Sequence, residues 1–140
     1  MKPWNEMMRF ILIVVLVASL IGCGQPSVSG QYIAADDRGA VMLRLVEAPD
    51  QTVSGELDFA SIDASGKIKR TQKQVTGSAD HDGITLTAES DSLVEGRTEY
   101  TGSVDGTAIT LTGPNGKLFL RRGDSDTFDR ALARLKTVSE

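Results

Sequence analysis

Apolar and polar residues alternate with a period of two along most of the chain after residue 27, which is the pattern of β-strands. The alternating segments are short, and turns rich in Gly, Asp and Asn separate them. The pattern predicts about eight strands joined by short turns, an order that favours an antiparallel meander. The strands are expected at residues 28–35, 41–46, 53–59, 67–79, 84–88, 96–104, 108–112 and 117–121.

Three of the predicted turns contain a dipeptide that tight hairpins favour. These are Asp82-Gly83, Asp105-Gly106 and Asn115-Gly116. Asp, Asn and Gly tolerate positive φ, which both central residues of the commonest two-residue hairpin turn require. We therefore expect each dipeptide to form the centre of its turn.

One hairpin design recurs along the chain. Segments 75–87 and 100–112 each contain a strand with a central glycine, a turn with Asp and Gly, and an Ile-Thr-Leu-Thr strand. The glycines are Gly77 and Gly102, and a fainter copy at 53–58 is centred on Gly55. A glycine inside a strand indicates a sharp bend or a close approach of another group. Convergent β-strand composition remains an alternative to true repetition.

The C-terminal segment changes to helical spacing. Its apolar residues Phe128, Ala131, Leu132 and Leu135 recur at i, i+3, i+4 and i+7. Asp124 and Asp126 precede them, where acidic side chains stabilise the start of a helix. The segment 124–140 is therefore predicted to be an amphipathic helix that packs on the outside of the sheet or across one mouth of a barrel.

These elements predict an all-β fold, an antiparallel meander of about eight strands that forms a small closed or partly open barrel with one C-terminal α-helix. The barrel domain is expected to span 30–123. Strand 67–79 is unusual, because Lys67, Lys69, Arg70 and Lys73 leave neither of its faces apolar. If the barrel is imperfect, we expect it to open along this strand.

The N-terminus has the layout of a secretory signal. Lys2 and Arg9 precede an apolar run at 10–18, which is shorter than the roughly 20 residues of a membrane span. The run ends in Leu20-Ile21-Gly22-Cys23, which resembles the lipobox of bacterial lipoproteins. The resemblance implies cleavage before Cys23 and acylation of Cys23, with 1–22 as signal peptide and 23–29 as a lipidated tether. An uncleaved signal anchor with an inert cysteine is the alternative.

The resemblance also gives an expected address. A lipoprotein is held to a membrane of the cell envelope through the lipid on Cys23. In enteric-type bacteria an aspartate after the cysteine favours the inner membrane, and here Gly24 stands in that place. We therefore expect the outer membrane in a Gram-negative organism, with the domain facing the periplasm or the cell surface.

Charge and cysteine content narrow the function classes. The formal net charge is −4, and removing a leader that holds Lys2, Glu6 and Arg9 changes it to −5. An acidic domain argues against nucleic acid as a partner. Cys23 is the one cysteine in the chain, so its acylation leaves no thiol for a disulfide, a nucleophile or a metal site.

The two ends of the predicted barrel resemble those of lipocalins and other calycins. Gly30-Gln31-Tyr32 is similar to the Gly-x-Trp of that family, with Tyr in place of Trp. Arg121 or Arg122 matches the basic residue that packs over the aromatic ring. The Thr-Asp-Tyr loop of lipocalins is missing. The resemblance implies a barrel architecture, and it suggests a carrier of a small apolar ligand as one function.

Candidate sites are few. Tyr32 and Tyr100 are the aromatic residues expected to line a ligand-binding mouth. Lys67, Lys69, Arg70 and Lys73 are a candidate basic patch for lipid headgroups, peptidoglycan or an acidic partner, or alternatively a charged strand that prevents edge pairing. Asp80, His81 and Asp82 are better explained as a solvated turn than as metal ligands.

No catalytic set is recognisable, and no cofactor or metal is expected. His81 is the one histidine and no Gly-x-Ser-x-Gly elbow accompanies it. The leading hypothesis is a non-enzymatic binding or accessory module of inhibitor, immunity or exclusion type with an envelope protein as partner. The alternative is a calycin-like carrier, which requires a hollow interior of roughly 300 Å³ or more.

Overall fold

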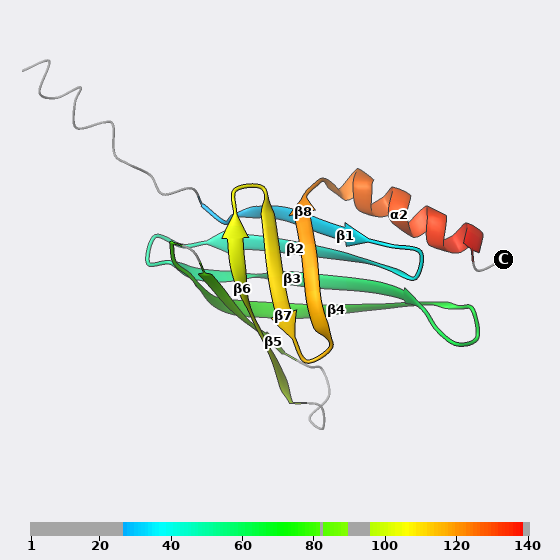
Figure 1. Ribbon diagram of the computed structural model, residues 1–140, viewed down its shortest axis with the longest axis horizontal. Helices are drawn as coiled ribbons and strands as arrows, with labels where there is room; N and C mark the ends of the chain where they lie inside the picture. The colour runs from blue at the N-terminus through cyan, green and yellow to red at the C-terminus, as the bar shows by residue number, and fades with distance from the viewer. Residues whose placement is uncertain (1–26, 82, 90–95, 139–140) are drawn as a thin grey trace, which may run out of the picture.

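The computed structural model describes residues 27–81, 83–89 and 96–138. They form a closed antiparallel barrel of eight strands and one helix, so the predicted fold class is confirmed (Figure 1). The strands are β1 (Gly30–Ala35), β2 (Gly39–Glu47), β3 (Thr52–Ile62), β4 (Ile68–Ala79), β5 (Gly83–Glu89), β6 (Arg97–Asp105), β7 (Ala108–Gly113) and β8 (Gly116–Arg122), and the helix is α2 (Ser125–Val138).

Each strand pairs with the next one along the chain, and β8 returns to pair with β1. The longest ladder joins β3 to β4, from Thr52↔Ser78 to Ile62↔Ile68. Both strands extend beyond the β5 ladder, which covers Val75 to Ala79 of β4. The barrel therefore has one compact end, where the chain enters β1, and one end where the strands spread apart. We call these the closed end and the open end.

Alternate residues of every strand point inward and form the main core. Tyr32, Leu43 and Leu57 are each at most 1% exposed, and the opposite wall supplies Leu86 and Leu111. This packing fills the closed half of the barrel with apolar side chains. The apolar positions of the period-two pattern are therefore the buried ones, as expected.

The three repeat glycines occupy equivalent places. Gly55, Gly77 and Gly102 each lie opposite a buried leucine of the neighbouring strand, in the pairs Leu45↔Gly55, Gly77↔Leu86 and Gly102↔Leu111. A Cβ built on any of them would lie 1.8 or 1.9 Å from a carbonyl oxygen of that strand. The neighbouring backbone occupies the space of a side chain, so the repeated hairpin design has one structural cause.

Two of the three expected tight turns differ from their expected positions by one residue, and the third contains Asp82, which lies outside the described residues. Asp105 pairs with Ala108, so Gly106 and Thr107 are the central residues, and Gly106 has a φ of 52°. Gly113 pairs with Gly116, which leaves Pro114 and Asn115 in the centre. Among described non-glycine residues Gln51 has positive φ, which excludes the double-positive turn at both sites.

Helix α2 covers the outer face of β1, β2 and β3, as the amphipathic pattern predicted (Figure 1). Phe128 and Leu135 are buried there against Ile33, Ala40 and Met42. The helix begins after Asp124, whose carboxylate accepts hydrogen bonds from the Thr127 backbone N–H at 2.8 Å and hydroxyl at 2.7 Å. These bonds lower the pKa of Asp124. A second, smaller core thus lies outside the barrel wall.

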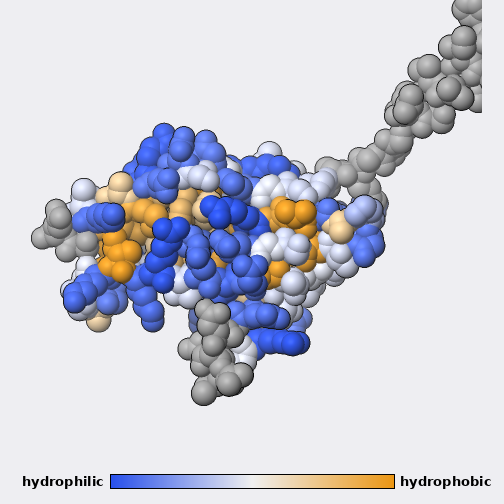
Figure 2. All heavy atoms as spheres, turned by 180° about the vertical axis from the view of Figure 1, so that it is seen from behind, coloured by the Kyte–Doolittle hydropathy of each residue, from blue (hydrophilic) through white to orange (hydrophobic). Residues whose placement is uncertain are grey.

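The visible surface on the side opposite to the view of Figure 1 is mainly hydrophilic, with apolar groups showing between the polar side chains (Figure 2). The most exposed large apolar residues are Val46, Phe119 and Val138. Within the described segments, α2 is too short and too polar to cross a bilayer.

Candidate functional site: the seam between β1 and β8

The barrel closes over a short ladder. In the described chain, β1 and β8 share two residue pairs, Tyr32↔Arg122 and Ile33↔Arg121. Beyond Ile33 the two strands run apart, so Gly116–Leu120 has β7 as a neighbour on one side and no strand on the other. A cavity of about 700 Å³ opens in this gap. We call the gap and its cavity the seam.

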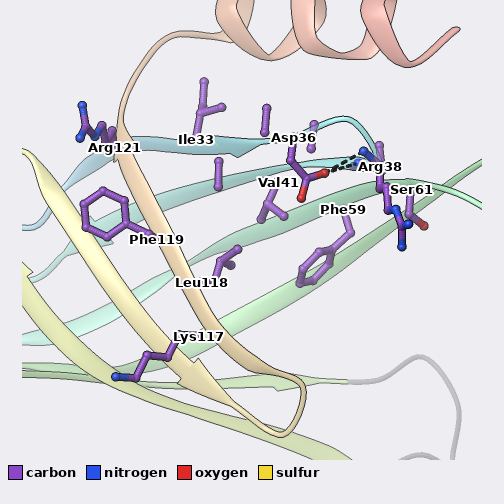
Figure 3. A pocket seen from close by; sticks show the side chains of 15 residues that line it. Ile33, Asp36, Arg38, Val41, Phe59, Ser61, Lys117, Leu118, Phe119 and Arg121 are labelled. Carbon is purple, nitrogen blue, oxygen red and sulfur yellow. Dashed lines mark hydrogen bonds between the residues drawn. The ribbon is translucent and has the colours of Figure 1, made fainter. Parts of the chain in front are cut away.

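Inward side chains from four strands form the floor of the seam. Ala34 of β1, Val41 of β2, Phe59 of β3 and Leu118 of β8 are partly buried and pack against the main core. Figure 3 shows Leu118 on the side of β8 that faces Val41 and Phe59. The seam is therefore a place where the hydrophobic core reaches solvent, which is the usual character of a ligand or partner site.

Cations surround this apolar floor. Arg38, Lys117 and Arg121 line the seam and are exposed, and Arg121 lies over the ring of Phe119 with 5.5 Å from its Cζ to the ring centroid. Asp36 is the carboxylate among the lining residues, and its Oδ1 accepts hydrogen bonds from the backbone N–H groups of Arg38 and Gly39. With three cations and one carboxylate among its lining residues, the seam has a positive local charge that favours a negatively charged partner.

The described chain opens at two places. We expected an imperfect barrel to open along 67–79, and residues 68–74 of β4 have no described partner on the β5 side, where the ladder covers Val75 to Ala79. On its other side β4 is held to β3 over eleven residue pairs, from Thr52↔Ser78 to Ile62↔Ile68. The cavity lies at the second opening, between the first strand and the last, which was not expected. The charge of a strand does not report where the shear of a barrel leaves its closing ladder short.

The four residues of the candidate basic patch do not act as one surface. Lys69 and Lys73 fall on the inward side of β4 by register, and Lys67 lies in the loop before it. Arg70 points outward, where its Nε and Nη2 donate to the two carboxylate oxygens of Asp58 at 3.0 and 2.6 Å. The guanidinium also lies 5.6 Å from the ring centroid of Phe128. Arg70 is thus committed to the contact between barrel and helix.

The burial of Asp58 explains why Arg70 is held in this position. Asp58 is the one buried charged side chain among the described residues, at 1% exposure. Gln72 Nε2 approaches Asp58 at 3.4 Å and Glu56 at 3.3 Å, and Arg44 pairs with Glu56 at 3.2 Å. The hydrogen bond to Asp58 raises the pKa of Arg70 above its usual value. A buried carboxylate requires such partners, so the patch loses Arg70 as a free cation.

Tyr32 lies at the closed end with no exposed surface. Its hydroxyl donates to the Val28 carbonyl at 2.9 Å, and Arg122 lies over its ring with 5.2 Å from Cζ to the centroid. Burial raises the pKa of Tyr32 above 10.0, although Arg122 acts in the opposite direction. The predicted packing of a basic residue on this ring is confirmed for Arg122, and Tyr32 belongs to the core rather than to a mouth open to solvent.

Tyr100 faces the interior of the barrel and is half-buried. A Cβ built on Gly113 would lie 2.6 Å from its ring, so Gly113 makes room for this side chain. Desolvation raises the pKa of Tyr100 above 10.0. Tyr100 does not line the seam, and the structure does not bring the two tyrosines into one site.

Residues 27–29 of the expected tether form hydrogen bonds with the barrel domain. The Val28 N–H donates to Glu47 Oε2 at 2.8 Å, and Ser29 Oγ accepts a hydrogen bond from the Glu47 N–H at 2.8 Å. Val28 is 4% exposed, and Arg122 Nη2 donates to the Ser27 carbonyl. Residues 27–29 therefore belong to the closed end of the domain.

The remaining candidate residues lie outside the described residues or in an exposed turn. Cys23 and the leader lie outside the described residues, as does Asp82. His81 and Asp80 are exposed in the turn between β4 and β5. In the described part of the chain, no three His, Cys, Asp or Glu side chains gather as metal ligands would.

Comparison of the chain with family models, curated proteins and solved structures gives no match. The role of the seam is therefore argued from its geometry. Sequence reasoning missed its residues, although one signal was present. Leu118-Phe119-Leu120 is a run of three apolar residues between cations, where an alternating strand would have placed a polar residue.

Proposed function

We propose that the protein is a lipid-anchored, non-enzymatic binding module of the bacterial cell envelope, acting as an accessory, inhibitor, immunity or exclusion factor toward an envelope protein. The observation that carries the proposal is Leu20-Ile21-Gly22-Cys23 at the end of an apolar leader. Two or three acyl chains on Cys23 give the stable anchoring that a single chain does not. The predicted address is the outer membrane in a Gram-negative organism.

The domain supports an orientation on that membrane. The closed end begins at Ser27, four residues after Cys23, so the anchor holds it within roughly 14 Å at about 3.4 Å per residue. The loops and strand ends there are acidic, with Glu47, Asp50, Asp80, Asp105 and Asp124. An anionic lipid surface repels these carboxylates, so the short connection to Cys23, and not charge attraction, would keep this end near the membrane. The barrel would stand with its closed end toward the membrane and its seam facing outward.

A second candidate is the calycin-like carrier, and one observation favours it. The seam cavity of about 700 Å³ has apolar walls and a volume within the range of small-molecule sites. The closed half of the barrel, by contrast, is filled by its own side chains. We rank the carrier second, because the cavity is a lateral gap bordered by a free strand edge rather than an enclosed chamber.

Replacing Cys23 by Ser tests the anchor. We expect the wild-type chain in the membrane fraction with incorporated radioactive palmitate, and the C23S chain without label and no longer retained. Ser19→Ala, which leaves Leu20 to Cys23 intact, is the matched control and should behave as wild type. Membrane retention of C23S equal to that of the control would contradict the proposal.

A further inference from the structure

The seam exposes a strand edge that the barrel leaves without a partner. Gly116–Leu120 pairs with β7 through Gly113↔Gly116 to Ile109↔Leu120, and its other side borders the cavity. The backbone N–H and C=O groups on that side point toward the gap. A free apolar edge is a template for another strand, and proteins that keep one exposed use it or aggregate through it.

The two faces of this edge differ in chemistry. Leu118 and Leu120 point inward, and Leu118 continues the floor made by Val41 and Phe59 (Figure 3). Lys117, Phe119 and Arg121 share the outer face, and Phe119 is 54% exposed. A strand added here would meet apolar neighbours on its inner side and two cations flanking an aromatic ring on its outer side.

A second copy of this chain is a poor occupant. Antiparallel pairing of two β8 edges would gather Lys117 and Arg121 of both copies on one face. Strand β8 contains no carboxylate to separate them. Like charges on facing strands are destabilising, whereas opposite charges stabilise a ladder. The edge is therefore complementary to an acidic strand and not to itself.

We propose that the free edge of β8 accepts an acidic extended segment of another protein as an added strand. The inference rests on the proposed role as a binding module and names the chemistry of its partner. The segment presents carboxylates opposite Lys117 and near Arg121, and apolar side chains opposite Phe119 and over Leu118. Main-chain hydrogen bonds supply the affinity, and the alternating side chains supply the specificity. The sides of the seam provided by Arg38 and Val41 enclose the segment.

The probe that tests this proposal is the fluorescein-labelled peptide Asp-Val-Val-Val-Asp with blocked ends. Fluorescence anisotropy measures its binding to the full chain, purified from membranes into phosphatidylcholine nanodiscs, with empty nanodiscs as blank. Two control peptides are Lys-Val-Val-Val-Lys and the acidic peptide with N-methyl groups on its valines. We expect both to bind at least roughly tenfold more weakly than the probe.

Charge reversal in the protein gives the matched variants. In Lys117→Glu the acidic peptide should lose roughly tenfold in affinity and the lysine peptide should gain by a similar factor, because the facing pair is restored. Arg130→Glu, on the exposed side of α2, removes an equal charge and should leave both affinities unchanged. The exchange of preference is independent of folding defects, since an unfolded variant would lose both peptides.

Hydrogen exchange locates the site. The bound probe should protect amides within Gly116–Leu120 and leave those of β5 unchanged. Equal binding of the N-methylated or lysine peptide, or protection elsewhere, would overturn the proposal. Protection of the same amides by dodecanol but not by the peptide would assign the seam to a small apolar ligand. Protection that rises with protein concentration alone would assign it to a second copy. Either result leaves the C23S test of the anchor untouched, so the two proposals fail separately.

Discussion

Single residues without side chains determine how tightly this barrel can bend. Gly55, Gly77 and Gly102 let a carbonyl oxygen of the next strand approach to a distance that a Cβ would forbid. Each faces a buried leucine, so the curvature and the core packing depend on the same pair. The sequence repeat thus reflects one kind of backbone contact that occurs at three places in the barrel.

Gly102→Ala should therefore lower the free energy of unfolding by about 1–3 kcal/mol, the usual cost of forcing an extra methyl group into a packed site. The new Cβ would lie 1.9 Å from the Thr110 carbonyl oxygen, which belongs to backbone and cannot rotate away. Equilibrium denaturation in urea measures the change.

Gly83→Ala is the control for this substitution. The nearest atom to its new Cβ is the Asp80 carboxylate oxygen at 3.3 Å, at the end of a side chain that is able to move. Equal destabilisation of the two variants would show that the close backbone contact is not what requires glycine at position 102.

At the scale of elements, α2 acts as a second layer on one side of the barrel. Its inward face packs on outward side chains of β1, β2 and β3 that would otherwise be an exposed apolar patch. The Arg70–Asp58 pair and the ring of Phe128 join the helix to β3 and β4. The helix is therefore a structural part of the domain.

Leu135→Ala should reduce the free energy of unfolding by about 2–5 kcal/mol, as large-to-small changes at buried sites do. Leu135 is 2% exposed at the end of the helix farthest from Asp124. Thermal and chemical denaturation check the change, and Arg130→Ala on the exposed side serves as control. A Leu135→Ala variant as stable as the control would mean that the helix does not stabilise the barrel.

The elements were predictable because each leaves a local signal. Period-two alternation located all eight strands, and the spacing of Phe128, Leu132 and Leu135 located the helix. Strand ends were less accurate, since β3 runs on to Ile62 and β2 starts at Gly39. The two turn dipeptides at 105–106 and 115–116 were displaced by one residue, because ladder register and not dipeptide preference decides which residues are central.

The seam was not predictable from local pattern. Its short ladder depends on how far β8 is displaced along β1 after eight strands of accumulated twist and shear, a property of the whole barrel. Arg38 and Val41, Phe59, and Leu118 come from three separate regions of the sequence and meet through that closure. The same limit applies to the partnership of Arg70 with Asp58, which cross-strand register creates.

At the scale of the whole molecule, the two ends of the barrel have different roles in the proposal. The closed end is acidic, fills its interior and receives the chain from the side of Cys23. The open end carries the seam, the cations around it and the free edge of β8. An anchor at one end and a strand-binding edge at the other would present the partner site away from the membrane.

The chemistry at Cys23 decides whether the proposed anchor exists, and the mass of the N-terminal fragment tests it directly. The protein purified from membranes is digested, and the N-terminal peptide is measured by mass spectrometry. We predict a peptide that begins at Cys23, lacks residues 1–22 and carries the added mass of two or three acyl chains. A peptide that retains Met1 to Gly22 with an unmodified Cys23 would contradict the account.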